Sequence, residues 1–186
     1  MSNPQQAESS AKPPGQRPDV IIVMGVSGCG KSTVGEALAA RMGWAFHDAD
    51  SFHPPANVEK MRAGNALNDD DRWPWLDRLN AVLRHHVARR QPVVLACSAL
   101  RQRYRDRLAA RLSSALFVHL EGSFELIENR LRQRNHAYMP SSLLRSQFET
   151  LEAPRNAHTV DIAKSVDEIV EELERELIAA QPPARN

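Results

Sequence analysis

This sequence of 186 residues has few cysteines, no long apolar run and almost no net charge. Secreted proteins often have many cysteines, membrane proteins have long apolar runs, and nucleic-acid-binding proteins are often strongly basic. It has two cysteines, Cys29 and Cys97, which we expect in a loop and at a strand end, so a disulfide is not favoured and a reducing compartment is. No apolar run approaches the roughly 18 residues that a membrane-spanning helix needs. The net charge of +1 gives no overall field that would attract a nucleic acid or a membrane surface. These absences favour a cytoplasmic protein that binds neither.

The two ends of the chain differ in composition from its middle. Residues 1–18 are rich in Ser, Pro, Gln and Gly and lack the apolar segment of a secretory signal, so we predict a disordered tail there. Residues 181–186 are predicted to form a second, frayed tail. The intervening residues 19–180 have the length of a single domain, and the apolar share of 42% in the whole sequence is enough for a core.

A P-loop follows the first apolar run of this domain. Val20–Thr33 reads VIIVMGVSGCGKST, which places the pattern G-x-x-x-x-G-K-S between a predicted strand and a predicted helix. Glycines let backbone N–H groups surround a polyphosphate, and the helix that follows points its positive N-terminus at the same anion. Lys31 is expected to be catalytic by neutralising the β- and γ-phosphates, and Ser32 to ligate Mg²⁺. The predicted ATP-binding residues are Gly25, Val26, Ser27, Gly28, Cys29, Gly30, Lys31, Ser32 and Thr33.

Apolar runs alternate with helical periodicity along the rest of the domain. The predicted strands are Val20–Met24, Trp44–His47, Val93–Cys97, Leu116–Leu120 and Thr159–Ile162. The predicted helices are Lys31–Met42, a small one near Val58–Met61, one with Pro74 in its first turn, Arg101–Leu112, one capped by Ser123, Leu143–Thr150 and one that begins at Ser165. Because buried strands alternating with helices form a parallel sheet covered on both faces, we predict an α/β fold with three layers, α/β/α, and a five-stranded parallel sheet. Ligands of such sheets bind at the carboxyl ends of the strands.

Two aspartates, Asp48 and Asp50, follow the second predicted strand and lie beside the P-loop in this topology. Carboxylates two residues apart project to the same side of an extended chain. We assign Asp48 a catalytic role, either in the Mg²⁺ site with Ser32 or in proton removal. Asp50 is assigned to accept a hydrogen bond from a substrate hydroxyl. The alternative is that both acids only cap a helix or a turn.

Polar residues at the neighbouring strand ends indicate where a phosphate acceptor binds. The segment at about 51–73 is polar and poor in core residues, as in an acceptor-binding flap or a plain surface excursion. Arg101 and Arg105 lie one helical turn apart near the end of the third strand, where they could meet an anionic acceptor. The alternative is that this arginine-rich helix simply has a solvated face. The candidate substrate-binding residues are Asp50, His53, Arg72, Ser98, Arg101, Tyr104, Arg105 and His136.

A polar interruption at about 132–142 separates two helical segments and predicts a mobile lid. Arg130 and Arg134 lie one helical turn apart at its start, so both could face the γ-phosphate when the lid closes, and we predict that both are catalytic. The alternative is that they cover apolar surface with their side-chain stems.

The chain resembles the gluconate kinases, small P-loop kinases related to shikimate and adenylate kinases, in the stretches MGVSGCGKS, HDADSFHPPANVEKMRAGNALNDDDRWPWL, CSALRQRYRD and SQFETLE. The resemblance extends over roughly Asp19 to Val170. It implies transfer of the ATP γ-phosphate to the 6-hydroxyl of D-gluconate with Mg²⁺, by a cytosolic enzyme that is often a homodimer. Members of the family often read Gly-His-Phe in the lid, where this chain reads Asn135-His136-Ala137-Tyr138.

Without the resemblance, the residues support a small P-loop kinase of a small polar acceptor. Shikimate or a nucleoside monophosphate is then an alternative acceptor. A nucleotide switch or a nucleic-acid-binding NTPase is an alternative of another class. The guanine-reading pattern Asn-Lys-x-Asp is missing, and the arginine-rich helix lacks interleaved aromatic residues, so both of these last readings are disfavoured.

Overall fold

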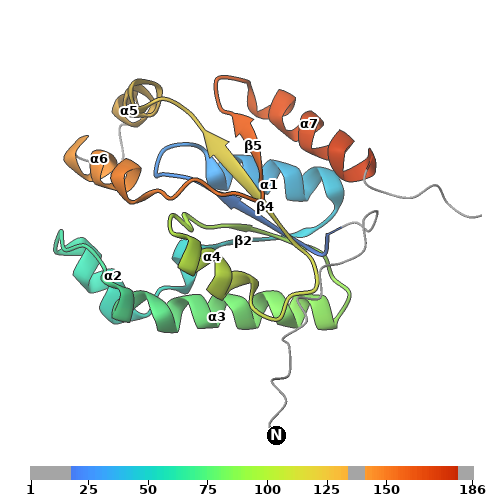
Figure 1. Ribbon diagram of the computed structural model, residues 1–186, viewed down its shortest axis with the longest axis horizontal. Helices are drawn as coiled ribbons and strands as arrows, with labels where there is room; N and C mark the ends of the chain where they lie inside the picture. The colour runs from blue at the N-terminus through green and yellow to red at the C-terminus, as the bar shows by residue number, and fades with distance from the viewer. Residues whose placement is uncertain (1–17, 134–140, 180–186) are drawn as a thin grey trace, which may run out of the picture.

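The structure is a computed structural model that describes residues 18–133 and 141–179. At its centre lies a five-stranded sheet in the order β2-β3-β1-β4-β5, in which all neighbouring strands are parallel (Figure 1). The strands are β1 (Val20–Met24), β2 (Ala45–Asp48), β3 (Val93–Ala96), β4 (Ala115–Glu121) and β5 (Ala157–Asp161). The predicted parallel sheet is therefore confirmed, with strand ends shifted by at most two residues.

Strand β1 occupies the middle of the sheet because its sequence VIIVM can be buried on both faces. All five side chains are fully buried, and β-branched residues suit a pleated strand. Val20 pairs with Val93 of β3 on one side and with Ala115 of β4 on the other. The loop after Met24 therefore leaves the sheet at the centre of its carboxyl edge.

Helices cover both faces of the sheet, which confirms the predicted three layers (Figure 1). One face packs against α1 (Lys31–Met42), α5 (Phe124–Gln133), α6 (Ser141–Thr150) and α7 (Val166–Ala179). The other face packs against α3 (Asp69–Ala88) and α4 (Gln102–Ala109). Over the described residues, no helix is long and apolar enough to cross a membrane.

Helix α3 begins five residues before Pro74, so the prediction that Pro74 lies in its first turn is wrong. Asn68 caps the helix: its side chain accepts from the N–H of Asp71, whose carboxylate accepts from the N–H of Asn68. This reciprocal pair and the acidic first turn stabilise the helix start. Pro74 removes one backbone donor inside the helix, and the capped start holds the turn in spite of it.

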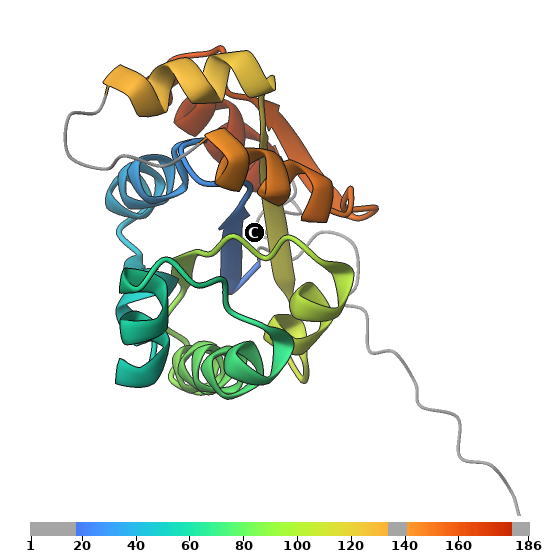
Figure 2. The same ribbon diagram turned by 90° about the vertical axis from the view of Figure 1, so that its left-hand side faces the viewer.

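The segment between β2 and α3 is ordered. It contains a short 3₁₀ helix, η1 (Ala49–Phe52), and helix α2 (Pro55–Arg62), longer than the predicted Val58–Met61. Asn57 is buried and donates to the carbonyl of Asp71, and Lys60 pairs with the Asp71 carboxylate at 2.5 Å. These contacts tie α2 to the start of α3, below the strand ends in Figure 2, while α5 and α6 lie above them.

Candidate active site

The P-loop forms a tight ring around the N-terminus of α1. Gly25 and Gly28 have positive φ values of 144° and 83°, which side chains rarely adopt. A Cβ on Gly25 would lie 2.9 Å from the carbonyl oxygen of Leu120, and one on Gly28 would lie 2.7 Å from the side chain of Leu131. The loop therefore needs glycine for both backbone conformation and space.

The first turn of α1 has the character of an anion site. Gly30 caps the helix in a left-handed conformation without any side-chain acceptor, and no acidic residue lies in the first turn. The N–H groups that open the helix are therefore available to a phosphate. The ammonium group of Lys31 folds back over the loop and donates to the carbonyl of Val26 at 3.1 Å. A cation and free backbone donors thus share one small space.

The two predicted metal ligands meet at this space. The Ser32 hydroxyl donates to Oδ2 of Asp48 at 2.5 Å, and Oδ1 of Asp48 accepts from the backbone N–H of Asp50 at 3.0 Å. Ser32 comes from α1 and Asp48 from the last position of β2, so the sheet topology brings them together. Since Mg²⁺ prefers oxygen ligands and keeps several waters, an adjacent hydroxyl and carboxylate beside an anion site fit this ion.

The acceptor side begins at η1. The Asp50 side chain is 88% exposed, so its carboxylate is available to a ligand. His53 is nearly covered: its ring stacks on Trp75 with centroids 4.1 Å apart, and Trp75 donates from Nε1 to the carbonyl of Ala49. Burial lowers the pKa of His53, which makes the neutral imidazole the stable form near pH 7. His53 therefore offers a hydrogen-bonding group without charge.

A charged network joins α3 to α4 on the same side. The Tyr104 hydroxyl donates to Oδ1 of Asp69 at 2.6 Å and accepts from the Arg72 guanidinium at 3.2 Å. The other carboxylate oxygen of Asp69 pairs with Arg103 at 2.5 Å. The hydrogen bond from Tyr104 and the nearby arginines hold the pKa of Asp69 below its usual value. The structure brings Arg72 and Tyr104 into contact, while their predicted role in substrate binding stays a prediction, and Asp69 is a member of the network that sequence reasoning left without a role.

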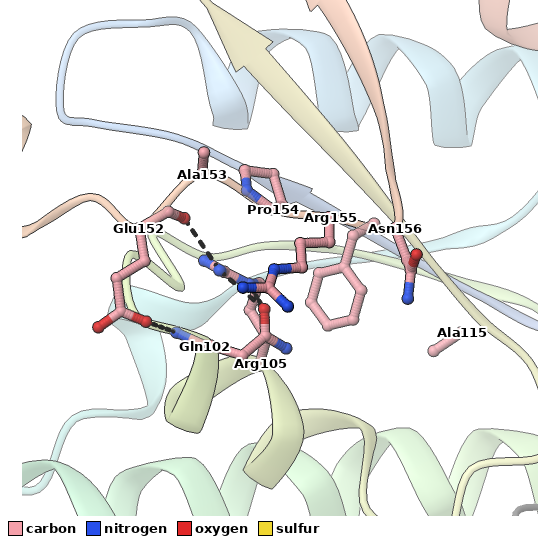
Figure 3. A pocket seen from close by; sticks show the side chains of 9 residues that line it. Gln102, Arg105, Ala115, Glu152, Ala153, Pro154, Arg155 and Asn156 are labelled. Atoms are coloured by element: carbon pink, nitrogen blue, oxygen red, sulfur yellow. Dashed lines mark hydrogen bonds between the residues drawn. The ribbon is translucent and has the colours of Figure 1, made fainter.

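Arg105 is a correction to the predicted substrate-binding set. The residue is 2% exposed, and its guanidinium donates to the carbonyls of Ala99, Leu100 and Glu152 and to Oε1 of Gln102. All three nitrogens are thus used inside the protein. Arg105 lines a cavity of about 800 Å³ together with Ala115 and Phe117, which lie in the first half of β4 rather than at its carboxyl end. Figure 3 shows Arg105 with Gln102 and Glu152 at this cavity. One helical turn does separate it from Arg101, but Arg105 points into the fold.

Two further predicted residues, Ser98 and Arg101, lie between β3 and α4 at this edge of the sheet. Ser98 follows β3, and its carbonyl accepts from the N–H of Gly25 at 3.4 Å, so the two loops are in contact. Arg101 precedes α4 as its N-cap and is half-buried, close enough to Asp69 to contribute to the lowered pKa of that carboxyl. Their predicted role in binding the acceptor stays a prediction.

The predicted lid lies only partly within the described residues. Arg134 and His136 lie outside the described residues, so their predicted roles are not tested. Arg130, on α5, donates to the carbonyl of Ile162 at 2.6 Å. It lines a cavity of about 340 Å³ between the P-loop and the loop after β5, together with Cys29, Thr33, Lys164 and Ser165.

Sequence reasoning did not predict this cavity. The rule that ligands bind at the carboxyl ends of strands applies equally to β5, whose last residue is Asp161. Applied there, it would have singled out Lys164 and Ser165. A second omission is Gln147 of α6, which hydrogen-bonds Ser27 of the P-loop and for which spacing alone gives no signal.

One buried thiol lies in the P-loop and another follows β3, and they form no disulfide. Cys29 and Cys97 are both free and buried. Burial raises the pKa of both thiols, that of Cys97 to about 12. Neither is a nucleophile at neutral pH, because the thiolate is the reactive form.

Comparison with known proteins assigns the chain to a family. The sequence model of the shikimate kinase family matches residues 27–180. A probable gluconokinase of Mus musculus is 47% identical over 174 residues, which cover 83% of this chain and 95% of that protein. The crystal structure of a gluconokinase from Sinorhizobium meliloti 1021 superposes with a TM-score of 0.79 at 46% identity, covering 88% of this chain and 94% of that one.

The similarity to shikimate kinase structures is more distant. The shikimate kinase of Acinetobacter baumannii in complex with shikimate superposes with a TM-score of 0.53 at 19% identity, covering 88% of this chain and 94% of that one. It shows the shared fold alone. With 46–47% identity to gluconokinases over most of its length, and with their P-loop fold, this chain belongs to the gluconokinases within the wider shikimate kinase family.

Proposed function

We propose that this protein is an ATP-dependent gluconokinase that transfers the γ-phosphoryl group of ATP to the 6-hydroxyl of D-gluconate. The observation that carries the proposal is the meeting of the P-loop with the Ser32–Asp48 pair at the sheet edge where the polar residues from η1 to α4 gather. The close relatives named gluconokinase support this acceptor over shikimate.

On the phosphate side, positive groups already in place would bind ATP and stabilise the charge that develops during phosphoryl transfer. The backbone donors of the P-loop and the first turn of α1 bind the phosphates, and Lys31 exchanges its bond to Val26 for one to the transferring group. Ser32 and Asp48 would hold Mg²⁺, which supplies charge neutralisation between the β- and γ-phosphates when it is bound. The 340 Å³ cavity beside Arg130 is the space that we assign to the nucleoside of ATP.

The acceptor side would orient gluconate. The exposed carboxylate of Asp50 accepts a hydrogen bond from a substrate hydroxyl, and neutral His53 supports a second one. Arg72, with Tyr104 beside it, and Arg101 supply positive charge for the substrate carboxylate, and we also assign Ser98 to acceptor binding. The alternative role for Asp48, in place of the Mg²⁺ site, is to receive the proton of the attacking hydroxyl; its carboxylate accepts from Ser32 and from the N–H of Asp50. We extend the proposal to Arg134 and His136 as lid residues that close on the phosphoryl group and the acceptor.

We further infer a cytoplasmic homodimer from the resemblance to the gluconate kinases. Light scattering after size-exclusion chromatography measures the assembly: a mass near twice 20.8 kDa supports the homodimer, and a mass near 20.8 kDa contradicts it.

A coupled assay of ADP release tests the activity. Gluconate, shikimate, a nucleoside monophosphate, glucose and sorbitol are each offered with ATP and Mg²⁺. We expect gluconate to be phosphorylated far faster than glucose or sorbitol, because the neutral compounds lack the carboxylate that a guanidinium fork binds. Preference for shikimate or for the monophosphate would replace the acceptor and keep the kinase. Turnover only in the presence of a nucleic acid would overturn both.

A further inference from the structure

Helix α6 contacts the P-loop through one side chain. Oε1 of Gln147 accepts a hydrogen bond from the backbone N–H of Ser27 at 2.7 Å, and Nε2 of Gln147 donates to Oγ of Ser27 at 3.0 Å. The carboxamide thus hydrogen-bonds both the backbone N–H and the hydroxyl oxygen of Ser27. The two residues are 120 positions apart in the sequence, so the contact joins the segment after the lid to the centre of the nucleotide site.

The chemistry of the two bonds fixes the direction of the Ser27 hydroxyl. A backbone N–H can only donate, so the amide atom facing it must be the oxygen, and Nε2 must face Oγ. Oγ of Ser27 is therefore an acceptor in this pair, and its own proton cannot point at Gln147. Across the described residues no acceptor for that proton is recorded, and the loop on which Ser27 lies surrounds the phosphate site. The hydroxyl is left as a donor for a phosphate oxygen.

The helix that carries Gln147 is rigidly held. Leu144, one turn before Gln147, is fully buried, and Phe148 packs edge-on against Phe124 of α5 with ring centroids 5.6 Å apart. After the helix, the N–H of Glu152 donates to the carbonyl of Leu100 at 2.8 Å. With anchors on both sides, the amide is fixed relative to the loop, which is what orienting a hydroxyl requires.

We propose that Gln147 is a positioning residue for the phosphoryl transfer: it holds the Ser27 hydroxyl so that the O–H donates to the phosphoryl group as charge develops on its oxygens. The inference rests on the proposed kinase activity and adds to it a residue outside the P-loop pattern. A donor fixed before the reaction stabilises the transition state more than the bound ATP, so its loss lowers kcat more than it raises the KM for ATP.

An alternative is that Gln147 competes with ATP for the P-loop. Its oxygen occupies one backbone N–H of the loop, so ATP would have to displace it. Removal of the side chain would then lower the KM for ATP and leave kcat unchanged or higher. A purely structural contact would lower the melting temperature and change neither constant. The three readings therefore differ in measurable quantities.

The test is a double-mutant cycle on kcat with Gln147→Ala, Ser27→Ala and the double variant, with Glu149→Ala as the matched control from the exposed face of α6. We expect Gln147→Ala to lower kcat by about 10-fold or more, on the scale of a lost transition-state donor, with the KM for ATP nearly unchanged. In the Ser27→Ala background the same substitution should have no further effect. Glu149→Ala should match the wild type.

Gln147→Glu sharpens the test because it keeps the shape of the side chain. A carboxylate only accepts, so it would take both the N–H and the O–H of Ser27 and turn the hydroxyl proton away from the phosphate. We expect a lower kcat than in Gln147→Ala, at a melting temperature close to the wild type. An equal loss of kcat in both Ser27 backgrounds, a lowered KM for ATP, or unchanged kcat in Gln147→Ala would each overturn the inference.

The outcome is separable from that of the proposed function. If the wild type prefers another acceptor, gluconate is wrong as the substrate, and the double-mutant cycle is measured with the preferred acceptor. If the wild type phosphorylates gluconate and the Gln147 variants behave like Glu149→Ala, the inference alone falls. A wild type without any kinase activity would end both.

Discussion

The phosphate side and the acceptor side of the proposed site use different chemical groups. The phosphate side consists of backbone N–H groups, glycines and two residues of one helix start, Lys31 and Ser32. The acceptor side consists of side chains from η1, α3 and α4 held by one another, as in the Asp69–Tyr104–Arg72 network. The first depends on the conformation of a continuous stretch of chain, and the second on how distant elements pack.

This difference explains how the two halves can change. Backbone donors do not depend on side-chain identity, so a P-loop can serve many acceptors as long as its glycines remain. Each side chain of the acceptor network contributes its own charge and shape, so a single substitution there alters what is bound. Substitutions on the phosphate side should therefore affect turnover with every acceptor, and those on the acceptor side should separate acceptors from one another.

The largest effect should come from the phosphate side. We expect Lys31→Met to lower kcat by at least ~10³-fold, because it removes the cation that meets the transferring phosphoryl group. The melting temperature should stay near that of the wild type, since within residues 18–133 and 141–179 the ammonium group makes one hydrogen bond, to the carbonyl of Val26. The same loss should appear with any acceptor. A folded Lys31→Met protein with full activity would remove the kinase proposal.

The next largest effect distinguishes Asp50 from Asp48, which lie between the phosphate side and the acceptor side. Asp50→Asn should raise the KM for gluconate about 10- to 100-fold, the equivalent of about 1.5–3 kcal/mol for a hydrogen bond to a charged group, and leave the KM for ATP unchanged. Asp48→Asn should instead shift the Mg²⁺ concentration needed for half-maximal activity upward and lower kcat. Steady-state kinetics with each ligand varied in turn measure both. If Asp50→Asn changed only the KM for ATP, Asp50 would belong to the phosphate side.

A smaller effect distinguishes structural from substrate-binding arginines on α4 and its N-cap. Arg105→Ala should cost about 2–4 kcal/mol of stability, because it leaves several carbonyls without their donor, and should lower the melting temperature by about 5–15 °C. Arg107→Ala, which breaks an exposed ion pair with Asp77, is the control and should lower the melting temperature much less, because exposed ion pairs contribute little to stability. Arg101→Ala should keep the melting temperature and raise the KM for gluconate. A raised KM in Arg105→Ala without loss of stability would restore its predicted role.

The same contrast accounts for what the sequence could and could not predict. The strands and the P-loop were predictable because their signals are local: β-branched runs, and glycines at fixed spacing before Lys31. Arg105 could not be assigned, because helical spacing places it beside Arg101 but does not tell which of the two points into the fold. Gln147 lies in the stretch SQFETLE that resembles the gluconate kinases, but nothing in that stretch points to its partner, which lies 120 residues away. Long-range pairing, not element type, is what sequence reasoning lacked.

The smallest effect concerns pH and the buried histidines. Burial lowers the pKa of His47, His53 and His119, in His47 with a further contribution from nearby His86. The folded protein therefore keeps these rings neutral, while the unfolded chain takes up protons below pH 6.5. Since the unfolded state then binds more protons, the free energy of unfolding falls as the pH drops below about 6.5, until the lowered folded pKa values are reached.

The pH range of this prediction lies above the range in which the carboxylates take up protons. The pKa values of Asp69, Asp71 and Asp77 are lowered from an ordinary value of 3.8, so their contribution is present above that value and is lost at lower pH. Urea unfolding between pH 7.5 and 5 therefore reports mainly on histidines, with a slope of at most about 1.4 kcal/mol per pH unit for each one. His53→Gln should make the slope shallower, whereas His85→Gln, an exposed position on α3, should leave it as in the wild type. An unchanged slope in His53→Gln would mean that His53 takes up its proton in the fold, and its neutral role beside Asp50 on the acceptor side would then be wrong.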